Sequence, residues 1–192
     1  MAKVWFFIGS GLLAWGIGAI LFSAYPILND GQETPYPWYS DLGYLALPPF
    51  MIIALGILNR TLGLAAPIWG KIAAFVMFLV SVTASLSVNW DGLIDDDLLL
   101  KLVSAAYILV DPILLGAIVF MASAFRSGEV GEVWWYVVSG LIIYFLGNQA
   151  YTYLVFTEQY ATGSPIDISW PLGFGLLALA AVVNRNLLLS HK

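Results

Sequence analysis

Residues Lys101–Phe125 read KLVSAAYILVDPILLGAIVFMASAF, with only two charged side chains, Lys101 at the start and Asp111 within the run. The run exceeds the roughly 20 residues that an α-helix needs to cross the hydrocarbon core of a bilayer. Lipid offers backbone N–H and C=O groups no partner, so a crossing segment must satisfy them internally as a helix. This stretch therefore predicts a transmembrane α-helix.

Five further runs of the same kind surround it: Val4–Tyr25, Leu42–Asn59, Pro67–Val88, Val133–Phe156 and Ile168–Leu189. Hydrophobic residues make up 61% of the 192-residue chain and charged residues only 10%, whereas a soluble domain carries about 25% charged residues. We expect an all-α membrane protein of six transmembrane helices, with the lipid bilayer as its main partner.

The basic residues predict the orientation. All but Lys101 lie on one side of the six-crossing arrangement, namely Lys3, Arg60, Lys71, Arg126, Arg185 and Lys192. The opposite side collects the acids Asp30, Glu33, Asp41, Asp91, Asp95, Asp96, Asp97, Glu158 and Asp167. By the positive-inside rule, the basic side faces the cytoplasm. We therefore expect both termini inside a plasma membrane, and the net charge of −5 argues against nucleic-acid binding.

The two ends of the chain resemble each other. Laying Trp5–Leu13 on Trp134–Ile142 and Asp41–Tyr44 on Asp167–Trp170 pairs Gly11 with Gly140 and Gly18 with Gly147. The middle third is a weaker copy that begins at Trp69 and carries Ser104–Tyr107. Since a two-helix unit returns the chain to its starting side, we expect three parallel hairpins within one transmembrane domain, about 1–62, 63–128 and 129–192.

These motifs also resemble a known family. The first helix reads Trp-x-x-x-Gly-x-Gly-Leu-Leu-x-Trp-x-x-Gly from Trp5, and Ser40–Leu45 is followed by Pro48-Pro49. Together with Tyr160-x-x-Gly163 and Asp167-x-x-Trp170, this is similar to the multi-helix membrane sensor region that precedes diguanylate cyclase, phosphodiesterase (GGDEF/EAL) or histidine-kinase domains in bacteria. The resemblance implies a sensory role and a cytoplasmic signalling domain, either as a separate partner or in a longer protein.

Polar groups at membrane depth are the first candidates for a binding site. Asp111 is the only acid near the centre of an expected crossing, and Pro112 beside it removes a helical hydrogen bond. Asn148 and Gln149 lie at a comparable depth in the fifth helix. One interpretation is a polar ligand or proton site. The other is interhelical glue, with Asp111 bonded to Asn148 or Tyr107.

Asp41 and Asp167 open the second and sixth expected helices. Either they cap free N–H groups at those helix starts, or together with Ser104 they ring an outward-facing mouth backed by Tyr44, Tyr107 and Trp170. The second interpretation suits a small amphipathic ligand. These aromatic residues also fit an ordinary interfacial belt.

Other chemistries find little support in the composition. The chain has no cysteine and one histidine, His191, on the C-terminal tail, so we expect no metal site, no cofactor and no catalytic triad. We therefore do not expect an enzyme. Three functions remain: a sensory or ligand-binding module, a noncatalytic subunit of a larger membrane complex, and a small transporter or channel.

Overall fold

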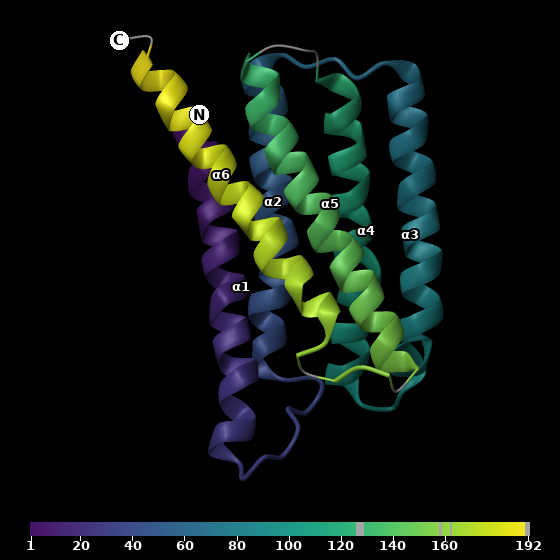
Figure 1. The fold of residues 1–192 in the computed structure, drawn as a ribbon. Helices are drawn as coiled ribbons and strands as arrows, with labels where there is room; N and C mark the ends of the chain where they lie inside the picture. Colours follow the sequence, from purple (N-terminus) through teal and green to yellow (C-terminus); the bar gives the residue numbers. More distant parts are fainter. Residues whose placement is uncertain (126–128, 158, 162, 191–192) are drawn as a thin grey trace. The chain divides into compact units, whose positions relative to one another are not determined.

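A computed structural model describes residues 1–125, 129–157, 159–161 and 163–190 (Figure 1). The described residues contain six α-helices, one 3₁₀ turn and no strand. The elements are α1 (Ala2–Leu28), α2 (Tyr39–Leu62), α3 (Ile68–Ile94), α4 (Leu98–Ala124), α5 (Glu129–Phe156), η1 (Pro165–Ile168) and α6 (Ser169–Ser190). The expected all-α fold of six helices is confirmed. Arg126, Glu158 and Lys192, used in the charge argument, lie outside the described residues.

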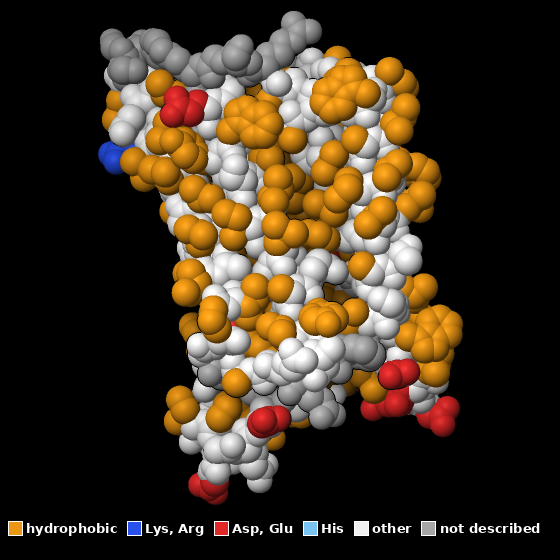
Figure 2. Space-filling model, turned by 45° about the vertical axis from the view of Figure 1, so that its right-hand side comes forward, with side chains coloured by type: hydrophobic (Ala, Val, Ile, Leu, Met, Phe, Trp, Pro, Cys, Tyr) orange, Lys and Arg blue, Asp and Glu red, His pale blue; other side chains and the backbone are white. Residues whose placement is uncertain are grey.

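Five of the helices are long and apolar enough to cross a membrane: α1, α2, α3, α4, and α6 together with η1. The remaining helix, α5, has 28 residues and packs against α6. Its mean hydropathy is lowered by Asn148, Gln149 and the aromatic run Trp134–Tyr136. Figure 2 shows hydrophobic side chains spread along the helices of one face, with acidic side chains mainly at its lower end. The chain is thus a multi-pass membrane protein.

The apolar helices expose much of their surface, as expected for helices that contact lipid. In α3 only 11% of the most hydrophobic window is buried, and large side chains such as Trp69, Ile72 and Phe75 are exposed. Hydrocarbon chains can cover such a surface, because lipid tails are as apolar as leucine.

The chain forms two compact units. Unit 1 comprises Met1–Gly63 and Phe78–Leu114, so it holds α1, α2, the second half of α3 and the first half of α4. Unit 2 comprises Leu64–Met77 and Leu115–Lys192, and includes α5 and α6. Each unit is described by itself below.

In unit 1, α1 and α2 pack closely because small residues face each other. A β-carbon on Gly18 would lie 2.7 Å from the Ser40 carbonyl oxygen, and one on Gly43 would collide with the Ala14 carbonyl. Nearer the chain's N-terminus, Gly11 meets Leu47 of α2. Glycines that let two backbones touch are the usual means of close helix packing in lipid.

In unit 2, α5 and α6 make contacts at the positions that the sequence alignment pairs with those of α1 and α2. Gly147, aligned with Gly18, meets Ser169, which is aligned with Gly43. Gly140, aligned with Gly11, meets Gly173, and a β-carbon on Gly140 would lie 2.6 Å from the Gly173 carbonyl oxygen. The two terminal hairpins therefore share one packing register.

Candidate functional site

Asp41 lies in the first turn of α2 and is 7% exposed. Its Oδ2 accepts the backbone N–H of Trp38 at 2.7 Å, which caps the helix, and its Oδ1 accepts the Tyr107 hydroxyl at 2.7 Å. A carboxylate at a helix start also opposes the positive end of the helix dipole. Because Tyr107 belongs to α4, this one side chain both caps α2 and joins it to another hairpin.

Tyr36 and Ser104 complete this group, which we call the Asp41 cluster (Tyr36, Asp41, Ser104 and Tyr107). The Tyr36 and Tyr107 ring centroids lie 6.4 Å apart, and Ser104 is buried. Although 51% of Tyr36 is exposed, desolvation of its hydroxyl raises its pKa, as does the charge of Asp41, while a hydrogen bond with Ser104 opposes the rise. The cluster thus combines a buried carboxylate with a tyrosine that reaches the surface.

Tyr44, expected behind Asp41, packs against aromatic side chains of α1. Its ring centroid lies 5.4 Å from that of Trp15 and 6.5 Å from that of Phe22. Tyr25 and Trp38 make a further edge-to-face pair at 5.1 Å. Aromatic rings therefore line the α1–α2 interface close to the Asp41 cluster.

Asp167 occupies the corresponding position in unit 2. Its Oδ2 accepts the backbone N–H of Gly163 at 2.8 Å and its Oδ1 accepts the Tyr160 hydroxyl at 3.2 Å. Asp41 and Asp167 therefore each accept one backbone N–H and one tyrosine hydroxyl. The tyrosine comes from α4 for Asp41 and from the α5–α6 connection for Asp167.

Trp170 and Asn148 lie next to this second carboxylate. The indole N–H of Trp170 donates to Asn148 Oδ1 at 2.9 Å. The ring of Tyr151 lies 5.7 Å from Trp170 and 4.7 Å from Tyr160, both edge to face. We call Asn148, Tyr151, Tyr160, Asp167 and Trp170 the Asp167 cluster; Gln149, the neighbour of Asn148, is partly buried.

Asp111 lies on α4 and is 6% exposed. It follows Ser104 by seven residues and Tyr107 by four, so the three share one face of α4. Asp111 belongs to unit 1 and Asn148 to unit 2. The structure brings Tyr107 to Asp41 within unit 1 and Trp170 to Asn148 within unit 2.

Three tyrosines in these clusters, Tyr36, Tyr151 and Tyr160, were not among the predicted site residues. Tyr36 precedes Asp41 by five residues and Tyr160 precedes Asp167 by seven. A tyrosine shortly before each aspartate was thus the sequence signal for these clusters. The sequence does not show whether the tyrosine lies against the carboxylate, because that depends on the loop conformation.

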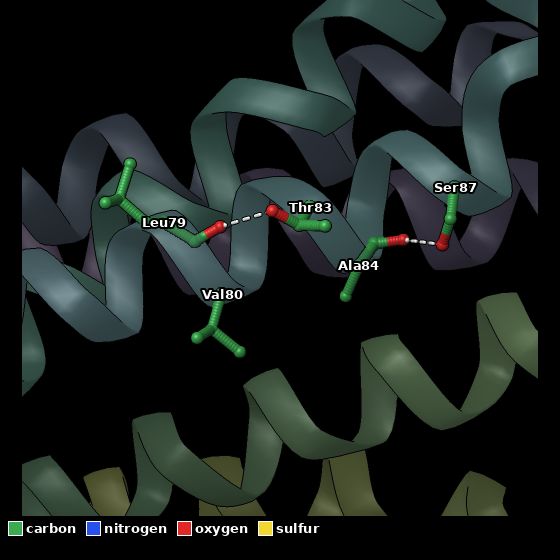
Figure 3. Close-up of a pocket in the computed structure, with 5 residues that line it drawn as sticks. All are labelled: Leu79, Val80, Thr83, Ala84 and Ser87. Carbon is green, nitrogen blue, oxygen red and sulfur yellow. Dashed lines mark hydrogen bonds between the residues drawn. The ribbon is translucent and has the colours of Figure 1, made fainter.

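A shallow open depression on α3 is less suited to a polar ligand (Figure 3). Its lining is Leu79, Val80, Thr83, Ala84 and Ser87. Both hydroxyls turn back into the helix, since Thr83 donates to the Leu79 carbonyl at 2.9 Å and Ser87 to the Ala84 carbonyl at 2.7 Å (Figure 3). Among these five residues the hydroxyl protons are thus already donated.

Comparison with known proteins finds no matching family model, no matching curated protein and no matching solved structure. Within the described ranges, no group of three or more His, Cys, Asp or Glu side chains could hold a metal ion. The two carboxylate–tyrosine clusters are therefore the strongest candidate sites.

Proposed function

We propose that this membrane protein is a sensory or ligand-binding module in which the Asp41 cluster receives an external signal. The observation that carries the proposal is the pair of 2.7 Å hydrogen bonds from Trp38 and Tyr107 to one buried carboxylate. A ligand that competes for Asp41 would release α4 from α2, because both bonds converge on the same group. The Asp167 cluster offers a second site of similar chemistry.

The charge distribution supports an external position for both clusters. Asp30, Glu33 and Asp91 lie near the Asp41 cluster along the chain, whereas Arg60, Lys71 and Arg185 lie toward the opposite helix ends. By the positive-inside rule, the basic ends are cytoplasmic. The proposal accordingly has the chain in the plasma membrane with both termini inside.

The chemistry of the clusters suggests the class of ligand. Carboxylates favour a hydrogen-bond donor or a cation, and the exposed Tyr36 ring favours an apolar or cationic face. A small amphipathic molecule with an amine or hydroxyl head satisfies both. The cytoplasmic ends of α2, α4 and α6 would then pass the movement to a signalling domain of the kind implied by the sequence resemblance.

The interior of α4 favours a module of this kind over a channel or transporter. Beyond Asp111, the side chains Leu114, Leu115 and Ile118 are buried and apolar. A polar path from the Asp41 cluster would end at these side chains. We propose a binding role for the two clusters and no catalytic one.

The proposal is tested by native mass spectrometry of the full chain released from its own membranes in mild detergent. We expect the wild type to carry a small-molecule adduct, and Asp41→Asn to lose it because the carboxylate for which the ligand competes is gone. Asp91→Asn is the matched control, since Asp91 is exposed near the end of α3. Absence of any adduct, or equal retention in both variants, would contradict the proposal.

A further inference from the structure

One face of α1 repeats a seven-residue pattern of large and small side chains. Phe6, Leu13 and Ile20 are 66%, 67% and 69% exposed, and each is followed three residues later by a small residue. Steps of three and four residues keep all six positions on one stripe of the helix. We call this stripe the α1 seam: Phe6, Gly9, Leu13, Gly16, Ile20 and Ser23.

The α1 seam lies on the side of α1 that faces away from α2. Gly11 and Gly18 are buried, and a β-carbon on either would touch α2. Gly11 follows Phe6 by five residues and Gly9 by two, which is about 140° and 200° around the helix. Contact with α2 therefore accounts for one face of α1 and does not cover the seam.

The seam glycines have no packing role within the chain. A β-carbon on Gly9 or Gly16 would meet nothing within 4 Å among the described residues. Glycine inside a helix is destabilising relative to alanine. Contact with lipid gives no reason to accept that cost, because any apolar side chain suits lipid. Close approach of another helix does give one, since small residues let two backbones touch.

The internal repeat shows that these two glycines are particular to α1. The α1 glycines that contact α2 have glycine counterparts in α5, whereas Gly9 aligns with Val138 and Gly16 with Phe145. Val138 and Phe145 are 1% and 7% exposed, so protein covers the corresponding face of α5. The same face of α1 is thus open, and its small residues are not inherited from the repeat.

We propose that the α1 seam binds the α1 seam of a second copy of this chain, as a parallel pair of helices around a two-fold axis along the membrane normal. Copies inserted in one orientation present α1 in the same direction and at the same depth, so the surface must complement itself. In a heptad seam, each large side chain enters a hole between residues of the facing helix, and glycines deepen these holes.

The charge pattern of α1 is compatible with pairing to a second copy. Between Lys3 and Asp30, α1 carries no charged side chain, so two copies bring no like charges together at membrane depth. The seven-residue spacing also predicts a left-handed crossing of the two helices. This inference goes beyond the proposed function and does not depend on ligand binding at the Asp41 cluster.

The test is disulfide cross-linking of the full chain in the membranes of the expressing cells. Because the chain has no cysteine, single-cysteine variants report the contact without background. We expect Leu13→Cys and Ile20→Cys to give disulfide-linked dimers on oxidation with copper phenanthroline. Leu21→Cys, 40% exposed on a neighbouring face of α1, and Val76→Cys, 48% exposed on α3, are controls that should stay monomeric. Absence of dimers at the seam, as expected if lipid or another protein covers it, would overturn the inference, and so would equal yields at all four positions.

A matched pair of glycine variants tests the close approach itself. In the Leu13→Cys chain, Gly16→Leu fills the seam and should lower the dimer yield by about ten-fold or more. Gly56→Leu is the control, because Gly56 lies on α2 and a β-carbon there also meets nothing within 4 Å among the described residues. Both side chains extend into open space, so both variants should fold, which thermal unfolding checks. Equal dimer yields from the two variants would overturn the inference.

Discussion

Close packing of α1 against α2 yields the sharpest prediction, for Gly43→Ala. A β-carbon at this position would collide with the Ala14 carbonyl oxygen and would lie 2.7 Å from the Gly18 nitrogen and 2.8 Å from its Cα. All three are backbone atoms, so no side-chain rotation can relieve the contact. The helices must separate, and everything packed along their interface must adjust.

The cost follows from comparison with a second glycine of the same helix. A β-carbon on Gly56 meets nothing within 4 Å. Both substitutions gain the same helix propensity, about 0.5–1 kcal/mol for alanine over glycine. Only Gly43→Ala pays for overpacking, typically about 1–3 kcal/mol. The difference between the two variants therefore isolates the steric cost, and we expect about 1–3 kcal/mol.

The measurement is reversible unfolding of each variant in bicelles, with the free energy of unfolding extrapolated to native conditions. Gly56→Ala should equal or slightly exceed the wild type, and Gly43→Ala should fall below both. If the two alanine variants were equally stable, the direct backbone contact between α1 and α2 would be refuted.

Three further predictions use the same kind of comparison. Gly173→Ala should destabilise the α5–α6 hairpin by about 1–3 kcal/mol in the same unfolding assay, whereas Gly175→Ala, which meets nothing within 4 Å, should not. Tyr107→Phe should cost about 1–3 kcal/mol, because it removes a donor from a buried carboxylate, and Tyr153→Phe should be neutral in thermal unfolding. The raised pKa of Tyr36 means that the folded chain holds this proton more tightly than the unfolded chain does. Its contribution to stability is therefore complete below about pH 10 and lost as pH rises through the folded pKa. Ultraviolet titration should show a late-ionising tyrosine signal that decreases in Tyr36→Phe.

Helix existence could be predicted from sequence because bilayer thickness fixes how long an apolar run must be. The first and last residues of each helix were harder to predict, since polar residues continue a helix past its apolar run. The second run was expected over Leu42–Asn59, but α2 runs from Tyr39 to Leu62. It starts earlier because the Asp41 carboxylate accepts the backbone N–H of Trp38 and so caps the helix. It ends later because the helix continues to Gly63, which takes φ 59° and donates its backbone N–H to the Asn59 carbonyl.

The partners of the polar residues were harder to predict. Tyr107 and Asp41 are 66 residues apart, and their meeting depends on how α4 packs in unit 1. Asp111 was expected to bond with Asn148 or Tyr107, and the sequence did not indicate the bond that Asn148 accepts from Trp170, 22 residues away in the same hairpin. Composition and spacing identify which polar side chains at membrane depth need a hydrogen-bond partner. Helix rotation and register, set by contacts such as Gly18 with Gly43, decide which partner they find.

Asp41 and Asp167 differ in the source of the tyrosine hydroxyl that each carboxylate accepts. Asp167 accepts its tyrosine hydroxyl from the loop of its own hairpin. Asp41 accepts the hydroxyl of Tyr107 on α4, so this hydrogen bond links two hairpins. The two terminal hairpins thus share one glycine register but differ at their aspartates. The bonds of Asp167 with Gly163 and Tyr160 stay within its hairpin, whereas Asp41 also bonds to Tyr107 of α4. Because this bond from Tyr107 to Asp41 links two hairpins, we place the proposed signal at Asp41.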